Sequence, residues 1–236
     1  MNTQHYLYAS IQALVAGVLV VTVVMLSYFI IEPQVGQAQA TSGPFTIKQT
    51  ITGEISFLVN AANVVATGTI NGITGGTANG STTAVVQTNS STGYEMTIAF
   101  ADNGTPQTMR GDSSLSQSIR DYPVVGGEPT FLFSTASTAA VFGYTVSAAI
   151  DTDLDPSFLD DGADCNIPTG SGGAYTADRC WMEPATTTFK IIDRTSAATS
   201  GATTSIQFRI HVPNNPSPAL VTDTYTATAT LTATNQ

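Results

Sequence analysis

The sequence predicts an all-β protein: an antiparallel β-sandwich of the immunoglobulin-like or jelly-roll-like kind, preceded by one N-terminal hydrophobic helix. Residues 11–31 contain no charged side chain. Beyond residue 40, apolar residues recur at every second position in short stretches separated by Gly, Pro and Asn, which is typical of strands with one buried face. No amphipathic helical spacing occurs there, so the βαβ crossovers of a parallel sheet are not expected.

The apolar stretch 11–31 would form a helix about 31 Å long, close to the thickness of a bilayer's hydrocarbon core. It has three interpretations: a secretory signal cleaved after the small residues Ala38 and Ala40, a retained transmembrane anchor, or a pilin-type assembly helix. All three place the rest of the chain outside the cytoplasm, extracellular or at the cell surface. We therefore expect residues 1–40 to be a signal peptide or anchor with a linker, and residues 41–236 to be a single β-sandwich domain.

Composition excludes some partners. Charged residues make up 10% of the chain, against about 25% in typical soluble domains. The formal net charge is −10, which disfavours nucleic acid, because phosphates require Lys and Arg. The simplest interpretation is that the acidity keeps an exported protein soluble.

In the first half of the domain, regular alternation predicts strands, and glycine and asparagine predict turns. Residues 82–88 and 94–101 flank the sequence NSSTG and are predicted to form a hairpin. A turn is predicted at residues 71–81. The other expected strands lie at residues 45–50, 55–61 and 62–70.

In the second half, two polar stretches are predicted to be loop excursions, at residues 102–129 and 151–185. The final run, 222–234, alternates most regularly, with Thr outward and Tyr225, Ala227, Ala229, Leu231 and Ala233 inward. A strand of this length is expected to cross a whole sheet. Strands are also expected at residues 130–134, 141–149, 187–192 and 204–212, with a proline-containing loop at 213–218.

Cys165 and Cys180 are the two cysteines of the chain. In an exported protein a close pair of this kind is most simply a disulfide. It would close a loop of about 16 residues, which is worth roughly 3 kcal/mol on the chain-entropy model. A metal site would need further ligands nearby at suitable spacing.

Three stretches resemble a group of uncharacterised exported proteins from ultrasmall bacteria of the candidate phyla radiation. They are FTIKQTITGEISFLV, FGYTVSAAIDTDLDPSF with the later pair Cys180-Trp181, and FRIHVPNNPSPALVTDTYTATATLTATNQ. The similarity spans most of residues 44–236. It implies surface exposure and a β-sandwich, and it brings no activity or catalytic residues.

The terminal YTATATLTAT is also loosely similar to the last strand of spore-coat-U and fimbrial subunit sandwiches. In those proteins, paired strands from neighbouring subunits build fibres. The chain lacks a recognisable fimbrial cysteine pattern.

Six aspartates fall within fourteen residues, and Ca²⁺ binds several oxygen ligands of this type. The spacing begins like a calcium-binding EF-hand loop, but Pro156 stands in place of its glycine and Gly162 in place of its glutamate. The alternative is a solvated acidic loop fastened by the disulfide. We thus expect no cofactor, and a structural Ca²⁺ stays an open possibility. Its candidate ligands are Asp151, Asp153, Asp155, Asp160 and Asp161, and Asp164 is the sixth aspartate of the cluster.

Other motifs are expected from composition alone. Residues 110–112 spell the adhesion tripeptide RGD, and Asn79, Asn89 and Asn103 begin N-glycosylation patterns. Trp181 could stack on a sugar or on another subunit, or pack over the disulfide.

No catalytic set stands out. His5 and His211 are the two histidines, and there is no G-x-S-x-G sequence. The leading prediction is a non-enzymatic, structural or adhesive surface protein that contacts copies of itself, a surface protein or a glycan, and the membrane through residues 11–31 if these are retained. The alternative is a calcium-dependent carbohydrate- or protein-binding module.

Overall fold

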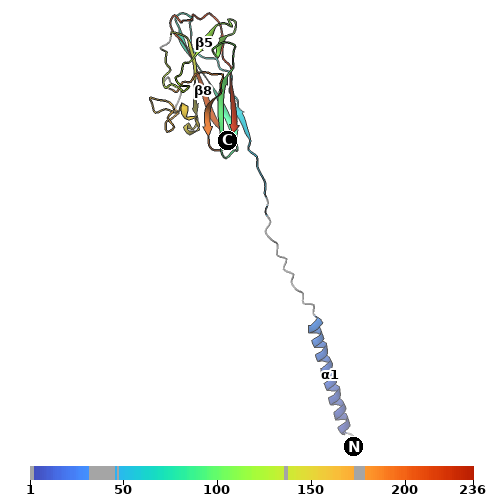
Figure 1. Ribbon diagram of the computed structural model, residues 1–236. Helices are drawn as coiled ribbons and strands as arrows, with labels where there is room; N and C mark the ends of the chain where they lie inside the picture. The colour runs from blue at the N-terminus through green and yellow to red at the C-terminus, as the bar shows by residue number, and fades with distance from the viewer. Residues whose placement is uncertain (1–2, 32–45, 47, 136–137, 173–178) are drawn as a thin grey trace. The chain divides into compact units, whose positions relative to one another are not determined.

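The structure, a computed structural model, describes residues 3–31, 46, 48–135, 138–172 and 179–236. The chain divides into two units, Met1–Thr50 and Ile51–Gln236. The first contains the helix α1, Thr3–Ile31 (Figure 1). Within it, Tyr8–Tyr28 has the length and hydropathy needed to cross a membrane. An N-terminal apolar helix is therefore confirmed, as either a signal or an anchor, and the cleavage positions Ala38 and Ala40 lie outside the described residues.

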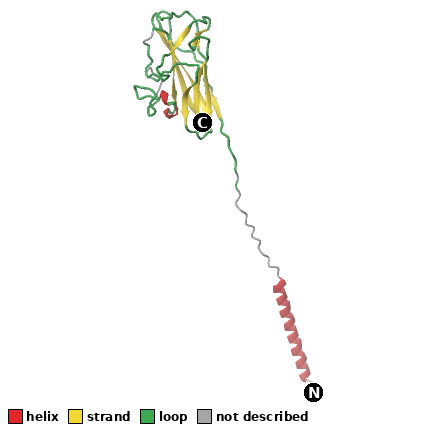
Figure 2. Ribbon diagram, in the orientation of Figure 1, coloured by secondary structure: helices red, strands yellow, loops and turns green. Residues whose placement is uncertain are grey.

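The second unit is built from strands (Figure 2), which confirms the all-β prediction. One sheet has the order β1-β2-β8-β6-β5-β4-β9, and a smaller sheet has the order β10-β3-β7. In the described residues the strands are β1 (Ile55–Val59), β2 (Gly76–Thr88), β3 (Tyr94–Phe100), β4 (Met109–Gly111), β5 (Ser118–Asp121), β6 (Val141–Ala148), β7 (Phe189–Arg194), β8 (Ala198–Val212), β9 (Tyr225–Thr226) and β10 (Ala229–Asn235).

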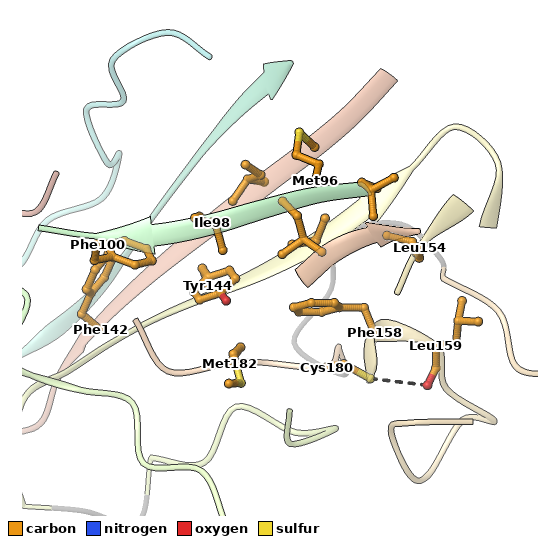
Figure 3. Packing of buried hydrophobic residues seen from close by; sticks show 14 of the residues in the cluster. Met96, Ile98, Phe100, Phe142, Tyr144, Leu154, Phe158, Leu159, Cys180 and Met182 are labelled. Atoms are coloured by element: carbon orange, nitrogen blue, oxygen red, sulfur yellow. Dashed lines mark hydrogen bonds between the residues drawn. The ribbon is translucent and has the colours of Figure 1, made fainter. Parts of the chain in front are cut away.

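The two sheets share one hydrophobic core. The ring of Phe100 on β3 lies 5.5 Å from the ring of Tyr144 and 6.0 Å from that of Phe142, both on β6 (Figure 3). All described members of this core fall between Ile55 and Ala233. Because burial of apolar surface is the main favourable term in folding, residues 51–236 supply their own core.

The predicted hairpin of residues 82–88 and 94–101 is wrong. Both segments are strands, but β2 pairs with β1 and β8, whereas β3 pairs with β10 and β7. The turn between them carries the chain from one sheet to the other. Gly93 has φ +84°, and a Cβ there would lie 1.8 Å from the carbonyl oxygen of Arg194, so this crossing requires glycine.

The predicted turn at residues 71–81 is also wrong in its second half. β2 begins at Gly76 and pairs along its length with the 15-residue strand β8. At Gly80 a Cβ would lie 2.4 Å from a methyl of Val64. The glycine therefore admits a neighbouring segment against the strand, which is one of the positional uses of glycine in sheets.

The final run does not cross one sheet. It divides into β9, which pairs with β4 of the large sheet, and β10, which pairs with β3 of the small sheet. Of the residues predicted to face inward, Tyr225, Ala227, Leu231 and Ala233 pack against the core and are half-buried, whereas Ala229 is exposed. A strand that changes sheets makes a corner between them.

The loop prediction for residues 102–129 missed β4 and β5, two short strands that bury Met109 and Ile119. β5 pairs with β6 in parallel over two residues, with residues 122–140 as the connection, so an antiparallel sandwich does not describe every pair. The strands predicted at residues 62–70 and 130–134 are absent from the described chain. Of the strand predicted at residues 45–50, the described residues 46 and 48–50 form no strand, and Phe45 and Ile47 lie outside the described residues.

Candidate functional site

A cleft of about 830 Å³ opens between the two sheets at one end of the β unit. The large sheet contributes Phe208 and Ile210 of β8, and the small sheet contributes Ile98 of β3 and Leu231 of β10. Much of the remaining wall comes from residues within 61–72 and 220–228, and core residues such as Phe100 and Phe142 also line it. This volume is in the range of ligand-binding pockets, and such pockets are mostly apolar.

The two sheets are joined beside Asn235, at the end of β10. There Thr88 Oγ1, at the end of β2, lies within hydrogen-bonding distance of Asn235 Oδ1, at 2.6 Å, and of the carbonyl oxygen of Glu54, at 2.7 Å. The cleft is instead lined by Ala229 and Leu231, at the other end of β10. The sheets are thus closed beside Asn235 and open beside Ala229.

A carboxylate lies at the rim of the cleft. Asp223 accepts hydrogen bonds from the backbone N–H groups of Ser113 and Ser114, at 3.0 and 2.6 Å. The bond from Ser114 is the main reason that the pKa of Asp223 lies below its usual value. Asp223 therefore carries a negative charge at neutral pH.

β10 borders the cleft and is the edge of the small sheet. The amide of Ala101 donates to the carbonyl of Thr228 at 2.8 Å, so the even-numbered residues of this run exchange hydrogen bonds with β3. The N–H and C=O groups of Ala229, Leu231 and Ala233 consequently face the other edge. No strand in the described part of the chain pairs with that edge.

The predicted carboxylate cluster is drawn apart by cations. Asp160 accepts a 2.9 Å bond from buried Arg179, Asp155 lies 3.5 Å from Lys190, and Asp153 pairs with Arg194. Among the described residues, no three His, Cys, Asp or Glu side chains are placed to hold a metal ion. A Ca²⁺ site at Asp151, Asp153, Asp155, Asp160 and Asp161 stays a prediction that this geometry does not support.

Asp161 makes a local turn instead. It accepts 3.0 Å hydrogen bonds from the amides of Ala163 and Asp164. The bond from Asp164 is the largest cause that lowers the pKa of Asp161. Hydrogen bonds within the loop thus stabilise the negative charge of the Asp161 carboxylate.

The disulfide between Cys165 and Cys180 is confirmed, with Cα atoms 5.7 Å apart. Cys180 belongs to the main core, as does Met182 (Figure 3). Trp181 belongs to a second buried cluster with Tyr122 and Val141.

Trp181 is fully buried. Its ring centroid lies 5.0 Å from that of Phe133, and the guanidinium carbon of Arg209 is 4.7 Å from it. A buried ring cannot stack on a sugar from solvent, so its contacts are structural.

The RGD and glycosylation motifs lie in ordered structure. Arg110 is half-buried in β4 and donates to the carbonyl of Asn103. Asn79 accepts a 2.9 Å bond from Arg209, and Asn89 accepts a 2.6 Å bond from the amide of Glu54. These side chains hold the fold together, which disfavours their presentation to a receptor or transferase.

His211, Asp121 and Glu183 are among the titratable groups with perturbed pKa values. Burial lowers the pKa of His211, and Arg209 lowers it further. Burial raises the pKa of Asp121, against hydrogen bonds from Thr108. Burial also raises the pKa of Glu183, and the charge of Asp121 adds to this.

Neither Asp121 nor Glu183 was predicted as a candidate site residue, because both lie in predicted loops. A pair with raised pKa values is a common feature of acid–base enzymes. Asp121, however, accepts from both the amide and the hydroxyl of Thr108, at 3.1 and 2.6 Å. Its carboxylate is used to hold residue 108 against β5.

The cleft was likewise missed. Its walls are the inward faces that alternation predicted in residues 206–212 and 225–233. Alternation does not reveal that these faces are left uncovered by the opposite sheet along part of their length. The available signal was the small side chains of Ala227 and Ala229, which leave space beside the half-buried Leu231.

No protein-family model matches the chain, and no curated protein matches it at a significant level.

Proposed function

We propose that this chain is a non-enzymatic protein exported to the cell surface, where copies associate through strand pairing to form envelope or appendage structure. The uncapped edge of β10 carries this proposal. Natural proteins protect sheet edges with charged residues, proline or bulges, because an open edge pairs with other chains. β10 has the sequence ATLTATN, and its pairing with β3 continues without a register shift over seven residues.

The other sheet edges are protected. β7, at the far side of the same sheet, carries Lys190, Asp193 and Arg194. β1, at one edge of the large sheet, has a register irregularity between Phe57 and Val59, and β9, at the other edge, is two residues long, which is a protection of the same kind. β10 is therefore the described edge best suited to accept a strand from another molecule.

Two further features support export. Residues 8–28 have the length and composition of a membrane-spanning or signal helix. The disulfide between Cys165 and Cys180 suits an oxidising compartment. Protease treatment of intact cells tests the location: we expect residues 51–236 to be digested while cytoplasmic proteins survive, and protection from protease until the cells are lysed would contradict export.

Assembly is tested with the chain without its first 40 residues, by electron microscopy and analytical ultracentrifugation. Ala233→Pro removes the outward N–H of β10 and leaves the pairing with β3, since proline is tolerated where the amide faces away from the sheet. Ala233→Val is the matched control, because it keeps that N–H. We expect the unmodified chain and Ala233→Val to assemble, and Ala233→Pro to stay monomeric with an unchanged melting temperature. Strictly monomeric unmodified protein, with or without Ca²⁺, would refute assembly.

A further inference from the structure

We propose that the cleft between the sheets receives residues 45–51 of a second copy, which add as a strand along the open edge of β10. This inference rests on the proposed self-association and specifies which segment makes it. It joins two features: an apolar cleft between the sheets and a sequence segment with the alternation of a strand.

The segment has the pattern of a strand with one buried face. Phe45, Ile47 and Ile51 alternate with Thr46, Lys48 and Thr50, a period of two. Yet the described residues of this stretch, 46 and 48–51, form no strand and are exposed. Ile51 is 82% exposed, an unfavourable position for a large apolar side chain unless a partner covers it.

The cleft matches the segment in chemistry and charge. The residues that line it from β10 and the run just before it, Ala227–Ala229 and Leu231, cover about 17 Å in extended form, so most of the seven-residue segment can lie beside them. The outward N–H and C=O groups of Ala229, Leu231 and Ala233 would form the ladder, while apolar side chains enter between Phe208, Ile210 and Leu231. Lys48, the one cation of the segment, complements the ionised Asp223 at the rim.

The β unit begins at the closed end of the cleft. Asn89 fixes residues 52 and 54 by hydrogen bonds of 3.1 and 2.6 Å, and a Cβ at Gly53 would lie 3.5 Å from the side chain of Asn235. Ala229 lies six residues away along β10, about 20 Å. We therefore assign the cleft to residues 45–51 of another molecule.

A pair of complementary variants tests this with the chain without its first 40 residues. The double variant Ile47→Asp/Ile51→Asp has an open cleft but an impaired segment. Ala229→Trp keeps the segment but fills the cleft. Thr230→Trp is its matched control, because Thr230 is the next residue of β10 and its exposed side chain lies on the face of the sheet away from the cleft. Circular dichroism and thermal unfolding show which variants are folded.

We expect each of the first two variants alone to remain monomeric, with self-association at least tenfold weaker than in the unmodified chain. Mixed together they should form dimers and nothing larger, because one supplies the segment and the other the cleft. Thr230→Trp should assemble like the unmodified chain. If Ala229→Trp does not fold, an excess of the peptide GPFTIKQTI should dissociate unmodified assemblies, and the same peptide with both isoleucines replaced by Asp should not.

The outcomes separate this inference from the proposed function. If the unmodified chain assembles and Ile47→Asp/Ile51→Asp assembles equally well, the segment is not the occupant, although self-association stands. If the two variants fail to form mixed dimers, or the peptide leaves assemblies intact, the inference is likewise overturned. If the unmodified chain is monomeric, both proposals fail.

Discussion

Arg194, at the end of β7, donates a hydrogen bond to the carboxylate of Asp153 in the short 3₁₀ helix η1 (Asp151–Asp153). The two side chains are 13% and 12% exposed. Arg194 also donates to the carbonyls of Ser196 and Ala197. This guanidinium therefore fastens the acidic segment to the small sheet and neutralises one of its charges where water has little access.

Arg194→Met is expected to lower the free energy of unfolding by about 3 kcal/mol, because it leaves the carboxylate of Asp153 poorly solvated and unpaired. Urea denaturation of residues 41–236 measures this. Lys190→Met is the comparison: its ammonium lies 2.5 Å from Asp193 and 3.5 Å from Asp155, but the lysine side chain is 37% exposed. Exposed pairs contribute under about 1 kcal/mol, so equal losses in the two variants would contradict this account.

Acid is expected to destabilise the β unit through carboxylates whose pKa values the fold lowers. The hydrogen bond from Lys190, followed by that from Gln236, lowers the pKa of Asp193. A carboxyl with a folded pKa below its unfolded value of about 3.9 stabilises the fold above that pH. This contribution is lost as pH falls through the folded pKa.

Melting temperature against pH measures the effect. Asp193→Asn should flatten the decline below about pH 4 relative to the unmodified chain. Glu95→Gln is a suitable control, because Glu95 lies opposite Asp193 in the pairing of β3 with β7 and forms no ion pair with any described residue. An acid limb that is unchanged in Asp193→Asn would show that this carboxyl does not contribute.

Reduction of the disulfide is expected to cost roughly 3 kcal/mol, since the cysteines are 15 positions apart and the bond restricts the unfolded chain. Denaturation with and without a reductant measures the loss. The Cys165→Ala/Cys180→Ala variant should be weakened similarly and should not respond to reductant. A reductant effect that persists in the double variant would rule out this bond as its cause.

Local patterns predicted much of the fold. Alternation located β3, β6, β8 and the inward face of β10, because each has one row of apolar side chains in the core. The disulfide followed from the separation of Cys165 and Cys180. Glycine-rich residues 76–81 were misassigned because pairing with β8 outweighs the weak strand propensity of glycine.

Long-range relations were not predictable from these patterns. Alternation shows that residues 82–88 and 94–101 are strands, but it does not show that they belong to different sheets. In the same way, aspartate spacing suggested a cation site, whereas Arg179, Lys190 and Arg194, distant in sequence, meet the carboxylates in the fold. The cleft also depends on how the two sheets pack against each other, because residues of both sheets line it.

Ca²⁺ provides the last test of the acidic segment. Asp153, Asp155 and Asp160 already face cationic side chains, and Asp161 is occupied by backbone amides. A Ca²⁺ ion takes six to eight oxygen ligands, so binding would require these ion pairs to break. We therefore expect millimolar Ca²⁺ to give no binding heat by calorimetry and no change in melting temperature. A rise in melting temperature that Asp153→Asn or Asp151→Asn abolishes would instead establish a calcium site and revive the binding-module interpretation.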